Sequence, residues 1–306
     1  MCFAGTFEEF KRRLKNGGVH FKYFEPLWRC SHFYFGRRLH EKIFVADETK
    51  ALVGGVNLAN RYNNMNGNPA WLDYSLYVEG EAAQKVFNYC HAQWTGKNER
   101  PQSLIKNTQK ENCSVRVRFN DWVKGKNEIW KTYFNWFNLA EESITIMCSY
   151  FLPGRVLRKR LGLAAKRGVK VKLILAGPSD VMLAKYAERY LYRWMLRNGI
   201  EIYEYQPAVL HAKMMVVDDH WVTIGSFNVN NVSAYASLEM NFDVRNKPFA
   251  YAVQQTMNTI IKNDCIQVTK KSPVFNTTFF RKFIQKSSYE IIRVVLNLST
   301  FYFKQE

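Results

Sequence analysis

Two segments of this 306-residue chain carry the same polar residues at the same spacing. They are LHEKIFVADETKALVGGVN, from 39 to 57, and LHAKMMVVDDHWVTIGSFN, from 210 to 228. Both fit the pattern H-x-K-x4-D-x6-G-[GS]-x-N, whose polar members are His40, Lys42, Asp47 and Asn57, then His211, Lys213, Asp218, Ser226 and Asn228. At a usage of about one in twenty for each residue type, such a repeat is very rare by chance. We therefore interpret both copies as parts of one functional site.

Each copy contains a run of apolar residues, 43 to 46 and 214 to 217, that predicts a β-strand. Because side chains alternate along a strand, the histidine and lysine of each motif fall on the same side. The glycine that follows allows another backbone segment to approach the site closely. If the two copies face each other, two histidines, two lysines and two asparagines line one pocket. Such a pocket is cationic and rich in hydrogen-bond donors, which suits the oxygens of a phosphodiester.

Two histidines in one pocket can divide the work of displacing a group from phosphorus. With an unperturbed pKa of about 6.5, one imidazole can attack as the neutral base while the other protonates the leaving alkoxide. A covalent phosphohistidine intermediate would result. The motif lysines and asparagines would stabilise charge on the non-bridging oxygens. The other four histidines show no ligand spacing with Cys, Asp or Glu, so we predict neither a metal site nor a cofactor.

The doubled motif resembles the H-x-K-D signature of the phospholipase D superfamily, and other segments extend the resemblance. They are WLDYSLYVEG from 71 to 80, SYFLPG from 149 to 154, AAKRGVKVKLILAGPSD from 164 to 180 and SLEMNFDV from 237 to 244. Over about residues 7 to 245 the chain resembles bacterial cardiolipin synthases. The resemblance implies a phosphatidyltransferase that makes cardiolipin from two phosphatidylglycerol molecules. It also implies an anionic phospholipid and a membrane surface as partners.

The resemblance also assigns roles to the acidic residues and to the two histidines. In this family the motif aspartate usually lies behind its strand and ties it down, which implies a structural role for Asp47 and Asp218. Glu239 stands where the family places a carboxylate that orients a catalytic imidazole, and Asp73 resembles its counterpart in the first half. The alternative for Asp73 is an exposed strand residue. The family pattern implies that His40 is the nucleophile and that the other motif histidine is the acid and base, although the sequence itself is symmetric on this point.

The order of elements expected after residue 113 is typical of an α/β fold. We expect strands at 114–119, 143–148, 169–176 and 200–205, and helices at 128–141, 155–167 and 182–197. The repeat predicts two pseudo-symmetric phospholipase D-like lobes, with mixed sheets flanked by helices. The expected divisions are a first lobe at 1–95, a polar connector at 96–112, a second lobe at 113–260 and a basic C-terminal region at 261–306.

The net charge of +18 favours an anionic partner, either nucleic acid or an anionic lipid surface. Two features favour lipid over nucleic acid. Small nucleases of the superfamily generally carry one motif and dimerise, whereas this chain carries two. From 245 onward the chain also holds ten Lys and Arg against three Asp and Glu, interleaved with large apolar residues as in an interfacial helix. The alternative for this segment is a terminal helix or strand that packs on the core.

Three functions remain open from the sequence. The first is the phosphatidyltransferase, and the second is a hydrolase, either a phospholipase or a nuclease, in which water replaces the acceptor alcohol. The third is an inactive fragment that only binds anionic surfaces. One departure from the family pattern bears on the product: cardiolipin synthases commonly follow the second G-S-x-N with an acidic residue and an Arg-Ser pair, but here residues 229 to 233 read VNNVS.

Upstream of the motifs the two halves match only in part. GVHFKYFEP, from 18 to 26, matches GIEIYEYQP, from 199 to 207, and an insertion follows between Pro26 and His40. The segment from 114 to 180 has no partner in the first half, so we expect the first lobe to be N-terminally truncated. By resemblance, membrane-spanning helices would lie in the missing part, with this chain peripheral on the cytoplasmic side of the cell membrane. The six cysteines show no disulfide framework, which favours a reducing compartment.

Overall fold

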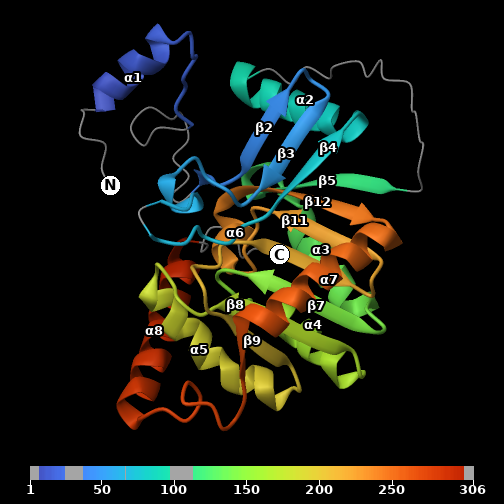
Figure 1. Ribbon diagram of the computed structural model, residues 1–306, viewed down its shortest axis with the longest axis vertical. Coiled ribbons are helices and arrows are strands. Elements are labelled where there is room, and N and C mark those ends of the chain that lie inside the picture. The colour runs from blue at the N-terminus through green and yellow to red at the C-terminus, as the bar shows by residue number, and fades with distance from the viewer. Residues whose placement is uncertain (1–6, 25–36, 66, 97–112, 300–306) are drawn as a thin grey trace.

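The computed structural model describes residues 7–24, 37–65, 67–96 and 113–299, whose arrangement is shown in Figure 1. The first half of the chain forms a small antiparallel sheet of order β2-β3-β4. Its strands are β2 (Lys42–Ala46), β3 (Lys50–Gly54) and β4 (Ser75–Glu79). Helix α2 (Glu81–Thr95) packs against this sheet, and the 3-10 helix η1 (Asn60–Tyr62) lies in the long loop between β3 and β4. Helix α1 (Phe7–Asn16) precedes them.

The second half forms a larger mixed sheet of order β13-β9-β8-β7-β10-β11-β12-β5-β6. Strands β7, β8 and β9 run parallel to one another, and β10, β11, β12 and β5 continue the sheet as antiparallel neighbours. The strands are β5 (Ser114–Asp121), β6 (Lys126–Asn127), β7 (Ser143–Cys148), β8 (Lys170–Ala176), β9 (Glu201–Tyr205), β10 (Lys213–Val217), β11 (Trp221–Gly225), β12 (Ser237–Arg245) and β13 (Cys265–Val268).

Alternate side chains of the larger sheet enter two different cores. One core lies under α3 (Glu128–Leu139), α4 (Arg155–Lys166) and α5 (Met182–Arg197), where apolar side chains of these helices cover one face of the sheet. The other core lies on the opposite face and includes residues of α7 (Lys247–Asp264). It also contains buried side chains of the first half, among them Val53 and Val78. The two sheets therefore share this second core, which fixes the halves against each other.

The backbone before the first motif also joins the larger sheet. Strand β1 (Arg38–Leu39) pairs in parallel with the start of β12, and the N–H of His40 donates to the carbonyl of Leu238 at 3.0 Å. Behind this strand the Arg37 guanidinium makes an ion pair of 2.8 Å with Asp121 of β5. The first motif is thus attached directly to the sheet of the second half.

The predicted elements of the second half agree with the structure, and two differences concern the flanks. The expected boundary at 260 falls inside α7, because Met257 and Ile260 continue the buried face of this helix. The C-terminal region then adds β13 to the larger sheet, and α8 (Phe279–Ser299) packs along α5 (Figure 1). Residues 97–112 of the expected connector lie outside the described residues, as do 25–36 of the expected insertion.

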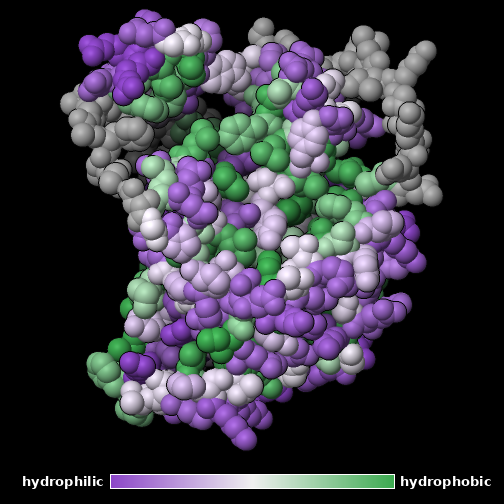
Figure 2. All heavy atoms as spheres, in the orientation of Figure 1, coloured by the Kyte–Doolittle hydropathy of each residue, from purple (hydrophilic) through white to green (hydrophobic). Residues whose placement is uncertain are grey.

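Residues 18 to 24 form no strand, although they match β9 in sequence. Strand β9 is held by β8 on one side and β13 on the other, and in the described part of the chain neither neighbour has a counterpart in the first half. The outer face of the small sheet is also open: Phe44 and Tyr77 are 48% and 53% exposed. Figure 2 shows hydrophobic surface across the middle of the view, below the hydrophilic surface of α1, and mostly hydrophilic surface over the lower part of the molecule.

Candidate active site

The two H-x-K motifs enter the structure in the same way. Lys42 is the first residue of β2 and Lys213 is the first residue of β10, so each histidine lies just before its strand. Each lysine turns back and donates a hydrogen bond to the main-chain carbonyl of the histidine in its own motif. This contact keeps each lysine next to the histidine of its own motif.

The carboxylates that orient the histidines are crossed between the halves. Glu239, on β12 of the second half, lies 2.9 Å from Nδ1 of His40 in the first half. Asp73, in the loop before β4 of the first half, lies 2.7 Å from Nδ1 of His211 in the second half. Both carboxylate side chains are buried, so the alternative of an exposed Asp73 is wrong.

This arrangement selects one tautomer of each imidazole. A carboxylate accepts from Nδ1–H, so the proton of the neutral ring resides on Nδ1 and the lone pair on Nε2. Each Nε2 is left available for proton transfer or for attack on an electrophile. The His40 side chain is 34% exposed and that of His211 is 9% exposed, so the two rings are not equally open to solvent.

The charged groups of the two motifs lie close enough to affect each other's pKa values. The pKa of Lys213 is lowered from 10.5 to about 8, mainly by burial, and the positive charge of Lys42 contributes to this decrease. Burial also lowers the pKa of Lys42 itself. The pKa of His211 is lowered mainly by burial, although the hydrogen bond that it donates to Asp73 raises it, and both lysines contribute to the decrease. A buried ammonium group beside a half-buried one is costly, which favours an anionic ligand between them.

The motif glycines allow the segments that carry the two carboxylates to approach closely. A Cβ on Gly225 would lie 2.2 Å from the carbonyl oxygen of Met240, next to Glu239. A Cβ on Gly55 would lie 2.4 Å from the carboxylate of Asp73. A larger residue at either position would displace the group that orients a histidine.

The remaining motif polar residues line or support the site. Ser226 donates to the same oxygen of Glu239 that faces His40, at 2.5 Å. Asn228 accepts a hydrogen bond from Ser149 at 2.8 Å, which leaves its amide N–H groups for other partners. Asn57 donates to the hydroxyl of Tyr62 at 3.1 Å.

The two motif aspartates lie away from the histidines, at the far ends of their strands. Asp47 and Asp218 adopt the same left-handed backbone, with φ of 51° and 50°. The carboxylate of Asp218 accepts three main-chain N–H bonds of 2.8 to 3.0 Å from residues 141 to 143, directly before β7. Within the described residues, the carboxylate of Asp47 has no hydrogen-bond partner. Geometry thus supports a structural role for Asp218.

Two aromatic residues beside His211, Tyr62 and Trp71, could not be identified from the sequence motifs. The Tyr62 hydroxyl lies 3.1 Å from its Nδ1, and the Tyr62 and Trp71 rings each lie 5.8 Å from the imidazole, centroid to centroid. Both residues belong to the loop between β3 and β4, which crosses to the second half. Their spacing from the motif follows no periodicity, so only the folded loop reveals them.

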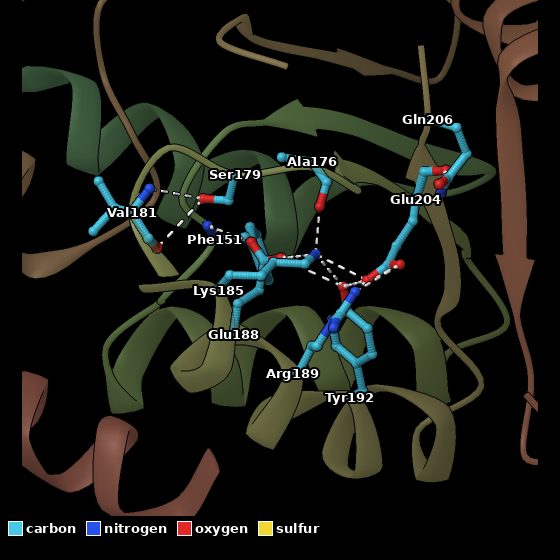
Figure 3. A network of polar contacts seen from close by, with 10 residues as sticks. All are labelled: Phe151, Ala176, Ser179, Val181, Lys185, Glu188, Arg189, Tyr192, Glu204 and Gln206. Atoms are coloured by element: carbon cyan, nitrogen blue, oxygen red, sulfur yellow. Dashed lines mark hydrogen bonds and ion pairs between the residues drawn. The ribbon is translucent and has the colours of Figure 1, made fainter. Parts of the chain in front are cut away.

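A buried network of charged side chains holds the loop that carries Ser149. Lys185 donates to the carbonyl of Ala176 and makes ion pairs of 2.9 Å with Glu188 and Glu204, as Figure 3 shows. The other oxygen of Glu188 accepts the N–H of Phe151 at 3.1 Å. The ends of β7, β8 and β9 are thereby tied to α5. Among the residues that the structure describes, no group of three His, Cys, Asp or Glu side chains is placed to hold a metal ion.

Comparisons with known proteins agree with this architecture. Residues 133–261 match the family model described as cardiolipin synthase, PLD-like domain. The chain is 30% identical to cardiolipin synthase B of Shigella flexneri over 273 residues, covering 85% of this chain and 65% of that protein. It is 28% identical to the probable cardiolipin synthase YwiE of Bacillus subtilis over 275 residues, covering 86% of this chain and 53% of that protein. The chain thus spans about half to two thirds of the length of these relatives.

A solved structure shares the two-lobed fold. Phosphatidylserine synthase of Haemophilus influenzae superposes with a TM-score of 0.63 at 15% identity, over 87% of this chain and 70% of that one. A doubled H-x-K site between two α/β lobes defines a phospholipase D-like protein. The chain belongs to the phospholipase D superfamily, and within it is similar to the cardiolipin synthases.

Proposed function

We propose that this protein is a phosphatidyltransferase that works through a phosphohistidine intermediate and joins two phosphatidylglycerols into cardiolipin. The observation that carries the proposal is the crossed pair of carboxylates, which leaves Nε2 of His40 and of His211 free beside two lysines, one buried and one half-buried. One nucleophile, one proton carrier and an anion-binding pocket are the parts that such a transfer requires.

In the first step, Nε2 of His40 attacks the phosphorus of one phosphatidylglycerol. The bond from phosphorus to the glycerol oxygen breaks, and this oxygen takes the proton from Nε2 of protonated His211. The anionic phosphodiester favours that protonated form because it offsets the nearby lysine charges. Lys42 and Lys213 stabilise the non-bridging oxygens as charge builds in the transition state.

In the second step, Nε2 of His211 takes the proton from a hydroxyl of a second phosphatidylglycerol. The resulting oxygen attacks the phosphorus, the bond to Nε2 of His40 breaks, and cardiolipin leaves. Glu239 and Asp73 keep each ring in its productive tautomer through both steps. His40 is assigned as the nucleophile because it is the more exposed of the two, and because the family pattern places the nucleophile in the first motif.

The surface of α8 supports action at an anionic membrane, with the protein bound peripherally. Tyr289 packs on Tyr190 of α5, with ring centroids 4.9 Å apart, while the start of α8 exposes three phenylalanines among basic residues. The phenylalanines are Phe279, Phe280 and Phe283, and the basic residues are Arg281, Lys282 and Lys286. Apolar and cationic side chains on one helix suit the headgroup region of anionic lipid. Within the described residues, no helix combines the length and the apolarity needed to cross a membrane.

Product analysis with labelled phosphatidylglycerol vesicles tests the proposal. We expect cardiolipin and free glycerol in equal amounts, and both should vanish in His40→Ala and in His211→Ala, with the double variant little worse than either. Acid quenching should trap a phosphatidyl group on one histidine. Phosphatidic acid as the main product would assign a hydrolase, and cleavage of single-stranded DNA with tighter binding than to vesicles would assign a nuclease. Full activity in either single variant would contradict the shared site.

A further inference from the structure

The loop between β3 and β4 places one exposed cation beside His211. This loop lies on the second half, where the N–H of Leu72 donates to Val209 at 3.0 Å and the N–H of His211 donates to Leu72 at 2.7 Å. It therefore forms part of the wall of the site on the His211 side, and it carries Asp73 into contact with that histidine.

Arg61, in η1 of this loop, is held in place by Trp71 in two ways. Its guanidinium lies over the Trp71 ring, 4.7 Å from the centroid, and its carbonyl accepts the N–H of Trp71 at 2.9 Å. The Trp71 ring in turn lies 5.8 Å from the imidazole of His211. Arg61 is exposed and forms no ion pair or hydrogen bond through its guanidinium within the described residues. Its charge is therefore fixed in position and free for an anionic ligand.

The positive charge of Arg61 affects the pKa values of two tyrosines near the site. Burial raises the pKa of the Tyr62 and Tyr150 phenols, and the positive charge of Arg61 opposes that increase at both. Tyr62 touches His211, and Tyr150 follows Ser149, which bonds the motif residue Asn228. The guanidinium therefore acts on the residues around the site.

The equivalent position in the second half holds no cation. Residue 232, which stands 171 positions after Arg61, is a valine that is 40% exposed. The two sides of the site thus differ in charge, as they do in the exposure of their histidines. A site that binds two phospholipids needs such a difference, because the donor and the acceptor play unequal roles.

We propose that Arg61, stacked on Trp71, binds the phosphate of the acceptor phospholipid, and so favours a phospholipid alcohol over water or a small alcohol. This inference rests on the proposed function. The acceptor hydroxyl must lie at Nε2 of His211 to lose its proton, and in phosphatidylglycerol three carbons separate that hydroxyl from the phosphate. Arg61 is one aromatic ring away from the same imidazole. Guanidinium groups bind phosphate through paired hydrogen bonds, and stacking on Trp71 reduces the entropy lost on binding.

The test is a competition between two acceptors, phosphatidylglycerol in vesicles and ethanol in solution. Phosphatidylglycerol vesicles labelled in the acyl chains, which both products retain, receive excess ethanol, and the ratio of cardiolipin to phosphatidylethanol is measured by thin-layer chromatography. Arg61→Gln should lower this ratio at least about tenfold, because loss of a charge-assisted contact affects only the acceptor that carries a phosphate. Arg61→Lys, which keeps the charge but not the paired donors, should lower it less.

Arg245→Gln is the matched control. Arg245 is also exposed and stacks on a tryptophan, Trp221, at 4.9 Å, but it lies at the opposite end of the larger sheet. Its ratio should equal that of the unmodified protein, and circular dichroism should show all variants folded. An unchanged ratio in Arg61→Gln would overturn the acceptor assignment while leaving the transferase intact. If the unmodified protein makes phosphatidylethanol and phosphatidic acid but no cardiolipin, both the inference and the proposed product fail.

Discussion

Replacing Lys213 by methionine should stabilise the protein at neutral pH while it removes activity. Lys213 is 1% exposed at the start of β10, and burial lowers its pKa from 10.5 to about 8. Methionine has a similar length and no charge, so it fills the space without the cost of burying an ammonium group. Loss of a cation that stabilises transition-state charge should lower turnover by at least about 100-fold.

The magnitude follows from the pKa. At about 1.4 kcal/mol per pH unit, a fall from 10.5 to about 8 means that burial of the charged form opposes folding by roughly 3 kcal/mol. The hydrogen bond from Lys213 to the carbonyl of His211 contributes about 1 kcal/mol in the other direction. We therefore expect the Lys213→Met variant to exceed the unmodified protein by about 2 kcal/mol in free energy of unfolding at pH 7.

The sign of the pH dependence is also fixed. Between pH 8 and 10.5 the folded protein has lost the Lys213 proton while the unfolded chain still holds it, so stability of the unmodified protein rises with pH. The methionine variant lacks this gain, and its advantage should shrink by about 2 kcal/mol between about pH 7 and about pH 9.5. Urea unfolding followed by circular dichroism at these two pH values measures the difference.

An exposed lysine provides the control for this experiment. Lys262→Met, on the exposed face of α7, should change the free energy of unfolding by less than about 0.5 kcal/mol at both pH values. A Lys213→Met protein that is less stable than the unmodified chain at pH 7 would refute the reasoning. So would an advantage that does not change with pH.

Three further predictions follow from the site and its supports. Glu239→Gln and Asp73→Asn should each lower turnover of phosphatidylglycerol by roughly 10²- to 10⁴-fold, because an amide disturbs the tautomer of its histidine; steady-state kinetics would contradict this if either variant turned over normally. Asp218→Ala should lower the free energy of unfolding by about 2 to 4 kcal/mol, since three N–H groups lose their acceptor. Asp47→Ala should change the free energy of unfolding by no more than about 0.5 kcal/mol. Equal losses for the two variants in urea titrations would contradict the structural role assigned to Asp218 alone. A variant of α8 with three phenylalanines replaced by serine should bind phosphatidylglycerol vesicles at least about tenfold less in a sedimentation assay. Vesicle binding that is unchanged both in this variant and when salt rises from about 0.1 to about 1 M would exclude an interfacial helix. The three positions are Phe279, Phe280 and Phe283.

Much of the second half could be predicted from the sequence. The strand at 143–148 and the helix at 182–197 agree with β7 and α5 at every residue, because apolar periodicity and flanking polar residues mark both clearly. Residues 18 to 24 show the limit of such matching, since a strand needs hydrogen-bonded neighbours that the sequence of the segment does not supply.

The candidate site could be predicted as a set of residues but not as a set of contacts. Repeated motifs indicate that the two halves meet, yet they are equally consistent with each carboxylate serving the histidine of its own half. Only the path of the loop from η1 to β4 decides that Asp73 reaches His211. The aromatic residues on that loop, Tyr62 and Trp71, have no fixed spacing from the motif, so their contacts with the imidazole depend on the same path.

Because the carboxylates are crossed, each half of the chain depends on a residue of the other half to orient its histidine. A chimera that took residues 1–95 from one homologue and 113–306 from another would give His40 a foreign Glu239 and His211 a foreign Asp73. Each histidine would then come from one parent and the carboxylate that orients it from the other. Libraries that shuffle such halves should therefore yield few active members, whereas crossovers that keep both pairs together should be tolerated. The same crossing means that two inactive proteins, one altered at His40 and the other at Glu239, damage the same imidazole although the changes lie 199 residues apart.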